Sequence, residues 1–474
     1  MFRIALCWCL LAGAVVAQPV PPQPSYNLQQ TLQEATNANP DLAQARARIE
    51  QARASAEQVY VALNPTVTGN FSYYRTFLPV ANQANGFTTF LNSLIPGFIP
   101  NNNGDPDTYT GGVVLNQTIY SFGKVRWQAL AAKLQLKKTG QDYRSTLLTI
   151  LQTAEKAYIS VKTSESQLEL VAQQQDLRQQ FLVIARNRFK AGLIAEYDVI
   201  QSDTQVRSVE LEMKNTTMQR DTARVALLVL MGHPEQQSSA HFEAMPDMLP
   251  PPPDLNAPLA SALEHRPEVA ALRWSLASAQ ASVEAAWHTN APNLSFVTQY
   301  LNTQVPNQQP QPNWVAGLQL SANFYDGGQA KTLAEQAMGV VQEVRGNLDS
   351  QSRQVESDVR TAYVQLTSLW EQLDQANQVC ALNDQAVKIA LNRYKAGLST
   401  STEWLTAQSN WNTAQQDRIQ LQANYRQSWA DWKRATAAPP PVDLPASALV
   451  DWSEPPRLLA PGEYPDEGWL EKDK

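Results

Sequence analysis

The sequence predicts an internally duplicated α+β fold in which long helical hairpins adjoin short pairs of amphipathic strands. The hexapeptide Arg-Phe-Lys-Ala-Gly-Leu at 188–193 is echoed by Arg-Tyr-Lys-Ala-Gly-Leu at 393–398. Each copy separates two long helical patterns that contain no proline, so each is predicted to be the turn of a helical hairpin. In each half the hydrophobic period also changes once from that of a helix to the two-residue alternation of a strand.

The duplication extends over most of the chain, because matching residues recur at fixed spacings. One spacing relates Pro40 to Pro267, Pro65 to Pro292 and Tyr73 to Tyr300, and a second relates Tyr120 to Tyr325, Gly123 to Gly328 and the two turns. The spacing changes only between the strands, where the first half has the longer loop. We therefore expect a first repeat at 18–233, a Pro-rich linker at 234–258 and a second repeat at 259–438.

The first 17 residues are predicted to be a secretory signal peptide. They carry one charge, at Arg3, then an apolar run and small residues before Gln18. Cys7 and Cys9 lie in this segment outside any lipobox-like context, so no lipid anchor is expected. Cys380 is then the remaining cysteine, which excludes an intrachain disulfide and suits a packed helical position.

Each repeat begins with a helix that ends at a proline. The first is expected at 28–63, with a kink near Asn39 and Pro40, and its twin at 259–288. Strand pairs follow at 66–120 and 293–325. In both pairs apolar side chains alternate with Thr, Ser, Asn and Gln.

These strands run for about 10 residues with aromatic residues at their ends, as transmembrane β-barrel strands do. A soluble antiparallel sheet with one wet face gives the same alternation. The occurrence of two copies, the signal peptide and the neighbouring long helices favour the membrane interpretation.

The helical hairpins are predicted at 124–231, turning near 191–195, and at 329–436, turning near 396–400. Their first helices, of roughly 67 residues, would be about 100 Å long. Helices of this length need partners along their sides. After them, residues 439–474 form a Pro-rich, acidic tail that we expect to be irregular.

Four strands are too few to close a barrel, and a bilayer does not tolerate unpaired strand edges. The chain should therefore assemble. Two copies would give a barrel filled by side chains, whereas three would give twelve strands and a lumen, so a cyclic trimer is favoured.

Taken together, residues 28–438 resemble the TolC-like outer-membrane efflux protein family in their duplication, their strand pairs and both Ala-Gly-Leu turns. The resemblance implies a homotrimer with a periplasmic α-barrel joined to a β-barrel in the outer-membrane lipid, four strands per chain and twelve per trimer. It implies a passive duct that works with a periplasmic adaptor (membrane fusion) protein and an inner-membrane transporter.

The same resemblance implies roles for the turns. The adaptor would dock at Ala191, Gly192 and Leu193, and at Ala396, Gly397 and Leu398. A Gly after a helix with basic residues in the last turn is also an ordinary helix end.

The resemblance further places a periplasmic gate at Asp198, Tyr394 and Glu403. Asp198 and Tyr394 would form one link that closes the mouth, and Glu403 an acidic ring. Alternatively, Asp198 is an ordinary first-turn acid, Tyr394 a packed ring, and Glu403 part of a capping box with Thr400. The family pattern is broken at Ser399 and Thr406, which leaves a second link and a doubled ring without support.

Other classes of protein are disfavoured. Charged residues make up 17% of the chain, the net charge is −7 and no basic cluster occurs, so no nucleic-acid partner is expected. The histidines lack metal-ligand spacing, and no nucleophile motif or phosphate loop appears, so no catalytic, cofactor or metal site is expected. A periplasmic helical scaffold or adaptor without a channel is the alternative.

Overall fold

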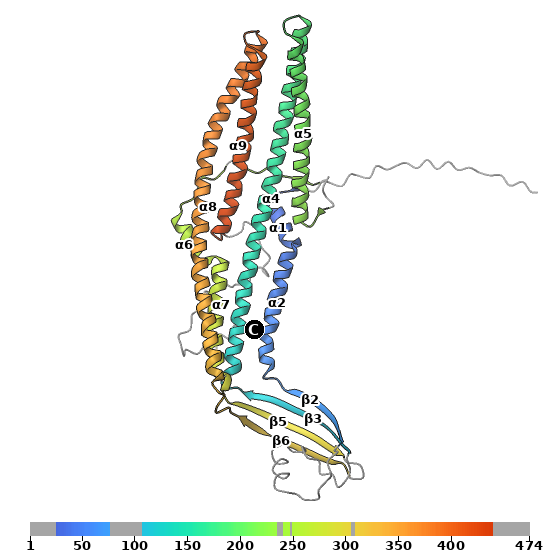
Figure 1. Ribbon diagram of the computed structural model, residues 1–474, viewed down its shortest axis with the longest axis vertical. Helices are drawn as coiled ribbons and strands as arrows, with labels where there is room; N and C mark the ends of the chain where they lie inside the picture. The colour runs from blue at the N-terminus through green and yellow to red at the C-terminus, as the bar shows by residue number, and fades with distance from the viewer. Residues whose placement is uncertain (1–24, 76–106, 235–239, 247–248, 305–308, 439–474) are drawn as a thin grey trace, which may run out of the picture.

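The computed structural model describes residues 25–75, 107–234, 240–246, 249–304 and 309–438. They form a long helical rod with a curved four-stranded sheet at one end and two hairpin turns at the other (Figure 1). The predicted signal peptide at 1–17, the longer loop of the first strand pair at 76–106 and the tail at 439–474 lie outside these residues. Among the described helices, none has a stretch long and apolar enough to cross a bilayer.

The predicted helix at 28–63 consists of two helices, α1 (Leu28–Ala38) and α2 (Pro40–Val61). Asn39 separates them in an extended conformation, which is the conformation that a following proline favours. Its side chain accepts a hydrogen bond from the Asp41 N–H at 2.8 Å and so caps α2. The second repeat has the same break at Arg266, between α6 (Asn256–His265) and α7 (Pro267–Trp287).

The four predicted strands form one antiparallel sheet in the order β2-β3-β5-β6. Their bounds are β2 Thr66–Arg75, β3 Asp107–Tyr120, β5 Asn293–Gln304 and β6 Gln311–Ser321. The central pairing joins the two repeats, since β3 pairs with β5. Within the described ranges, strands β2 and β6 each pair on one side only, which leaves the sheet with two open edges there.

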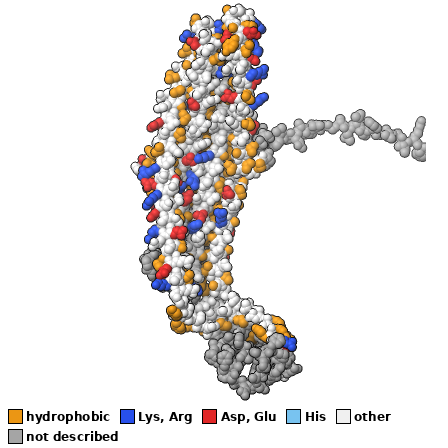
Figure 2. Space-filling view, in the orientation of Figure 1, with side chains coloured by type: hydrophobic (Ala, Val, Ile, Leu, Met, Phe, Trp, Pro, Cys, Tyr) orange, Lys and Arg blue, Asp and Glu red, His pale blue; other side chains and the backbone are white. Residues whose placement is uncertain are grey.

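The strand register collects apolar side chains on one face of the sheet. Paired residues lie on the same face, as Phe71 does with Gly111 and Tyr300 with Trp314. Residues two positions apart in a strand also share a face. That face carries Val67, Phe71, Tyr73, Tyr109, Val113, Leu115, Phe296, Tyr300, Trp314, Leu318 and Leu320. The opposite face is mostly Thr, Ser, Asn and Gln. In Figure 2 the visible part of the sheet is mainly white and orange, whereas red and blue side chains are scattered along the rod.

Three strand ends in the second repeat differ from the sequence pattern. The polar segment 302–312, typical of a loop, is largely taken into strands, because residues 302–304 extend β5 and Pro312 lies in β6. Pro312 is tolerated because β6 is an edge strand. The second strand pair stops at Ser321 instead of 325, since Gly327 and Gly328, with φ of 68° and 92°, turn the chain into the next helix.

The hairpins are formed by α4 (Lys124–Lys190) with α5 (Glu196–Leu230), and by α8 (Gln329–Lys395) with α9 (Ser401–Ala435). The first helix of each hairpin has 67 residues and the returning helix 35. The returning helices cover the half toward the turns, while α2 and α7 cover the half toward the sheet (Figure 1). The long helices therefore have packing partners along both halves.

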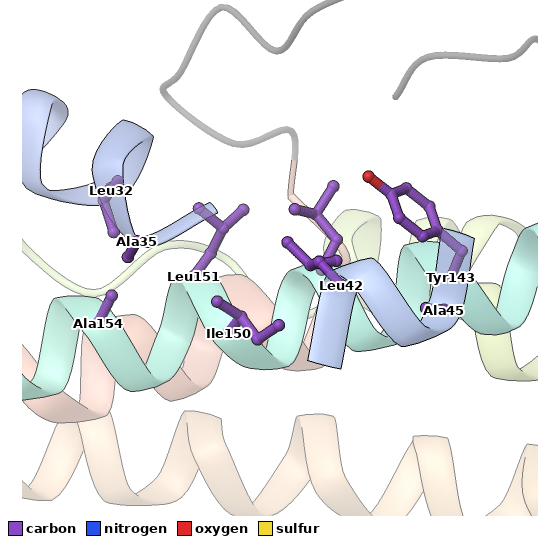
Figure 3. Close-up of a cluster of buried hydrophobic side chains, with 9 residues drawn as sticks. Leu32, Ala35, Leu42, Ala45, Tyr143, Ile150, Leu151 and Ala154 are labelled. Carbon is purple, nitrogen blue, oxygen red and sulfur yellow. The ribbon is translucent and has the colours of Figure 1, made fainter. Parts of the chain in front are cut away.

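The rod is held together by a series of small apolar clusters instead of one core. In one of them, Leu32 of α1 and Leu42 of α2 lie over Ile150 and Leu151 of α4 (Figure 3). A second cluster places Trp274 of α7 against α4. Burial in such clusters stabilises each large side chain by about 2 kcal/mol.

Ion pairs reinforce the contact between α9 and the middle of α4. Lys433 Nζ lies 2.7 Å from Glu155 Oε1, and Lys156 Nζ lies 2.5 Å from Asp431 Oδ1. These four groups join the two repeats at the height where α9 ends. Beside them, the short strands β1 (Ser25–Tyr26) and β4 (His241–Phe242) pair in parallel.

Candidate functional site at the hairpin turns

Both hairpin turns have the same backbone geometry. The Leu193 N–H donates to the Arg188 carbonyl at 3.0 Å and the Gly192 N–H to the Phe189 carbonyl at 2.8 Å. Leu398 and Gly397 repeat these bonds at 2.9 and 3.0 Å. This is the Schellman arrangement, which requires a left-handed residue after the helix. Gly192 and Gly397 meet that need with φ of 72° and 77°.

The first turn presents more apolar surface than the second. Leu193 and Leu398, at matching positions of the two turns, are 67% and 72% exposed. The first turn adds Tyr197 and Ile200, both also exposed. The other predicted docking residues, Ala191, Gly192, Ala396 and Gly397, are exposed as well. The end of the rod thus offers apolar side chains with no covering element among the described residues.

Arg188 links the first turn to the second. Its Nη1 donates to the Tyr394 carbonyl at 3.1 Å, and its guanidinium lies 4.8 Å from the centroid of the Tyr394 ring. The Tyr394 carbonyl lies in the last turn of α8 and also accepts the Gly397 N–H at 3.0 Å, so Arg188 adds a second hydrogen bond to it. A cation above an aromatic face adds a further attraction.

Asp198 makes the second link between the hairpins, and its partner differs from the expected one. The Ser401 hydroxyl donates to Asp198 Oδ1 at 3.1 Å and so joins the first turns of α9 and α5. The Tyr394 hydroxyl is buried and makes no hydrogen bond within the described part of the chain. The predicted Asp198–Tyr394 hydrogen bond is therefore not made inside one chain.

The physical reason is that Tyr394 packs into an apolar cluster. Its ring centroid lies 5.0 Å from that of Phe181, which in turn stacks on Trp404 at 4.0 Å. Tyr394 is only 2% exposed. The aromatic contacts hold the ring in the seam between the hairpins, where its hydroxyl makes no hydrogen bond with Asp198.

Glu403 lies in the first turn of α9 and is exposed. Its backbone N–H donates to the Thr400 hydroxyl at 3.3 Å, which is the N-cap bond that the sequence spacing suggested. The negative charge of Glu403 is also stabilised by the positive end of the α9 helix dipole.

Sequence reasoning missed Arg188 and Ser401 as linking residues. Arg188 has a matching arginine, Arg393, in the second repeat, so the pattern singled it out as a last-turn residue only. For Ser401 the sequence holds no signal, because its partner lies 203 positions away.

The fold and the turns define a class of protein: a duplicated helical-hairpin chain whose sheet has one apolar face and two open edges. Residues 31–233 and 259–438 match the model of the family described as outer membrane efflux protein. The chain belongs to this family, and its place is the bacterial outer membrane.

Curated relatives agree with this assignment. The chain is 22% identical to the toxin and drug export protein A of Aggregatibacter actinomycetemcomitans, over 72% of this chain and 75% of the relative. It is also 22% identical to the pyoverdine export outer membrane protein OpmQ of Pseudomonas aeruginosa, over 83% of this chain and 81% of the relative.

Solved structures show the same fold. The outer membrane protein VceC of Vibrio cholerae matches with a TM-score of 0.70 at 19% identity, covering 86% of this chain and 95% of that one. The MtrE channel of Neisseria gonorrhoeae, solved in an open state, matches with a TM-score of 0.66 at 18% identity, covering 86% and 88%. The predicted TolC-like fold is confirmed.

Among the described residues, no group of histidine, cysteine, aspartate and glutamate side chains is suited to hold a metal ion.

Proposed function

We propose that this outer-membrane export protein is one subunit of a homotrimeric, passive duct that carries substrates from an inner-membrane transporter across the periplasm and outer membrane. The chain itself performs no catalysis, and the transporter supplies the energy. The equal helix lengths of the two hairpins support the division into repeats at 18–233 and 259–438.

The observation that carries the proposal is the strand register. It gives the sheet one apolar face, on which Phe71 and Leu318 are 78% and 68% exposed, and one polar face. A bilayer on the first side and water on the second satisfy both faces at once. A soluble sheet would leave this apolar face in water without a covering layer.

The two open edges support assembly. Strand β2 of one chain and β6 of the next each lack a second partner among the residues that the structure describes. Pairing them around a three-fold axis would give twelve strands and leave no unpaired edge in the bilayer. Twelve strands are also enough to enclose a water-filled lumen.

The partners follow from the turns and from the family. The exposed Leu193 and Leu398 mark the surface where a periplasmic adaptor would dock, with Ala191, Gly192, Ala396 and Gly397 beside them. Relatives with 22% identity are named for drug and toxin export, pyoverdine export and protease secretion. These names support a tripartite system of transporter, adaptor and duct.

The periplasmic gate is proposed at the same end of the rod. Asp198 ties the hairpins through Ser401, and Tyr394 ties them through Arg188. Each hydrogen bond is worth about 1 kcal/mol, or somewhat more where one group is charged, so an adaptor can break them. Glu403, exposed beside them, would contribute negative charge to the mouth.

Single-channel conductance of the purified protein in planar bilayers tests the duct and the gate together. We expect small wild-type conductance and larger conductance for Asp198→Ala and Arg188→Ala. Arg186→Ala is the matched control, because Arg186 pairs with Asp203 inside the first hairpin at 3.3 Å.

Tyr394→Phe decides whether the buried hydroxyl has a role in the trimer. Increased conductance would assign it a partner in a neighbouring subunit, and unchanged conductance would remove it from the gate. Protein that is folded without detergent and does not insert would overturn the duct and favour the periplasmic scaffold.

A further inference from the structure

Along the contact between α4 and α9, stacked aromatic rings near the turns give way to buried polar side chains farther from the turns. Phe181 and Trp404 stack across it with ring centroids 4.0 Å apart. The two helices run antiparallel, so the next turn away from the hairpin tips contains Arg178 on α4 and Gln408 on α9. These two residues are therefore expected to lie beside each other. One more turn adds Gln174, which follows Arg178 along the same face of α4.

These three side chains are buried and polar. Arg178 is 8% exposed, Gln174 2% and Gln408 0%. Within the described part of the chain, several of their atoms make no hydrogen bond: Arg178 Nε and Nη1, Gln174 Nε2, and both Nε2 and Oε1 of Gln408. Buried polar groups are nearly always hydrogen-bonded, so this concentration on adjacent turns requires an explanation.

The unpaired atoms are mostly donors, and they include a formal charge. Arg178 supplies two donor nitrogens, and each glutamine supplies an amide nitrogen. No described carboxylate forms an ion pair with Arg178. Glu212 acts on it electrostatically, but Glu212 Oε1 already accepts a hydrogen bond from Gln416 Nε2 at 3.3 Å. Burial lowers the pKa of Arg178, and the Glu212 charge opposes this shift.

We propose that Arg178, Gln174 and Gln408 bind a small inorganic anion of halide size within this seam. A halide accepts several N–H bonds at once, donates nothing, and adds its negative charge to that of Glu212 near the guanidinium. Water would satisfy some of the donors, but it brings two donors of its own and no compensating charge.

A cavity of about 340 Å³ between α4, α5 and α9 offers an approach from solvent, and it lies farther from the hairpin turns than the three side chains do. Leu170 and Val171, one turn from Gln174 on the same face of α4, form part of its wall. From Leu170 the first donor, Gln174, is about one helical turn away, roughly 5 Å, and Arg178 is one turn farther along α4.

Bromide replaces chloride in such sites and can be located by its anomalous scattering. Crystals of the full chain grown in sodium bromide should show an anomalous peak within about 3.5 Å of Arg178 Nε or Nη1, the length of a weak N–H contact to an acceptor. An absence of any peak there, in crystals that show bromide elsewhere, would overturn the proposal and assign the donors to water.

Thermal unfolding in detergent gives an independent test. The unfolding midpoint of the wild type should rise when sodium chloride replaces sodium gluconate at equal ionic strength, since a ligand of the folded state stabilises it. Arg178→Met should abolish this rise. Arg186→Met is the control, because Arg186 is exposed and paired within its own hairpin, and the rise should persist. A rise that survives Arg178→Met would place the halide elsewhere and contradict the proposal.

Discussion

Ser401 and Asp198 join the two hairpins through one hydrogen bond of 3.1 Å, although 203 positions separate them in the chain. The bond lies between the first turns of α9 and α5, next to the exposed end of the rod. It is therefore placed where a small change in free energy would separate the hairpins.

Ser401→Ala should loosen the turns without disturbing the packing. Removal of one hydrogen bond to a charged group costs about 2 kcal/mol, which corresponds to roughly a thirtyfold shift in a two-state equilibrium. We expect the open probability in planar bilayers to rise by up to that factor. Ser409→Ala, an exposed serine two turns along α9, is the control. Equal behaviour of the two variants would remove Ser401 from the gate.

Gly192→Ala and Gly397→Ala should each destabilise the hairpin end by about 1 kcal/mol, because both glycines have positive φ. A Cβ at Gly192 would meet no atom within 4 Å, so the cost there is conformational. Gly339→Ala, inside α8 and in open space, should instead stabilise by a similar amount. Hydrogen exchange of the turn amides measures the first effect. Slower exchange in Gly192→Ala would contradict it.

Asp326 should make the start of α8 sensitive to acid. Its carboxylate accepts hydrogen bonds from the Ala330 N–H at 2.7 Å, from the Asn290 amide and from the Gly328 N–H at 2.8 Å. These bonds lower the pKa of Asp326 from 3.8 to about 2. The stabilisation is thus fully present above pH 3.8 and is lost as the pH falls through about 2.

The unfolding midpoints of the wild type and Asp326→Asn should therefore differ at pH 5 and converge toward pH 2. Ser121, the matching residue of the first repeat, accepts from the Val125 N–H at 3.3 Å with a neutral hydroxyl. The unfolding midpoint of Ser121→Ala should accordingly differ from that of the wild type by the same amount at pH 5 and near pH 2. A constant difference for Asp326→Asn would refute the carboxylate's role.

Two adjacent residues of β6 test which face of the sheet meets lipid. Leu318 lies on the apolar face and Gln319 on the polar one. Lysine at a lipid-facing site costs about 2–4 kcal/mol near the bilayer midplane, whereas the lumen tolerates it. Leu318→Lys should reduce insertion into vesicles, and Gln319→Lys should insert normally and change ion selectivity. The reverse result would mean that the face of Gln319 meets lipid and the face of Leu318 meets water.

Much of the fold could be predicted from the sequence, because its strongest signals are local. Gly123 and the Ala-Gly-Leu turn bound α4, and their counterparts bound α8, so these helix ends follow from residues at the ends themselves. The alternation in β2 and β5 likewise indicates strands. Strand ends depend on tertiary structure: a proline such as Pro312 normally indicates a loop, and the edge position that permits it in β6 is a property of the assembled sheet.

The candidate site could be predicted only in part. The turns were found from their repetition, and the Thr400 cap from its spacing. The partner of Asp198 could not be predicted, because Ser401 is 203 positions away and reaches it only once the hairpins meet. Tyr394 instead packs against Phe181, which stacks on Trp404.

The matched lengths of the helices constrain how this protein can change over evolution. Helices α4 and α8 both have 67 residues, and α5 and α9 both have 35. A single-residue deletion in α4 would rotate everything beyond it by about 100° and shorten that side of the rod by 1.5 Å. Viable length variants should therefore arise as coordinated changes in all four helices, in steps of whole turns. The reach of the rod across its compartment is then a trait that changes in discrete steps.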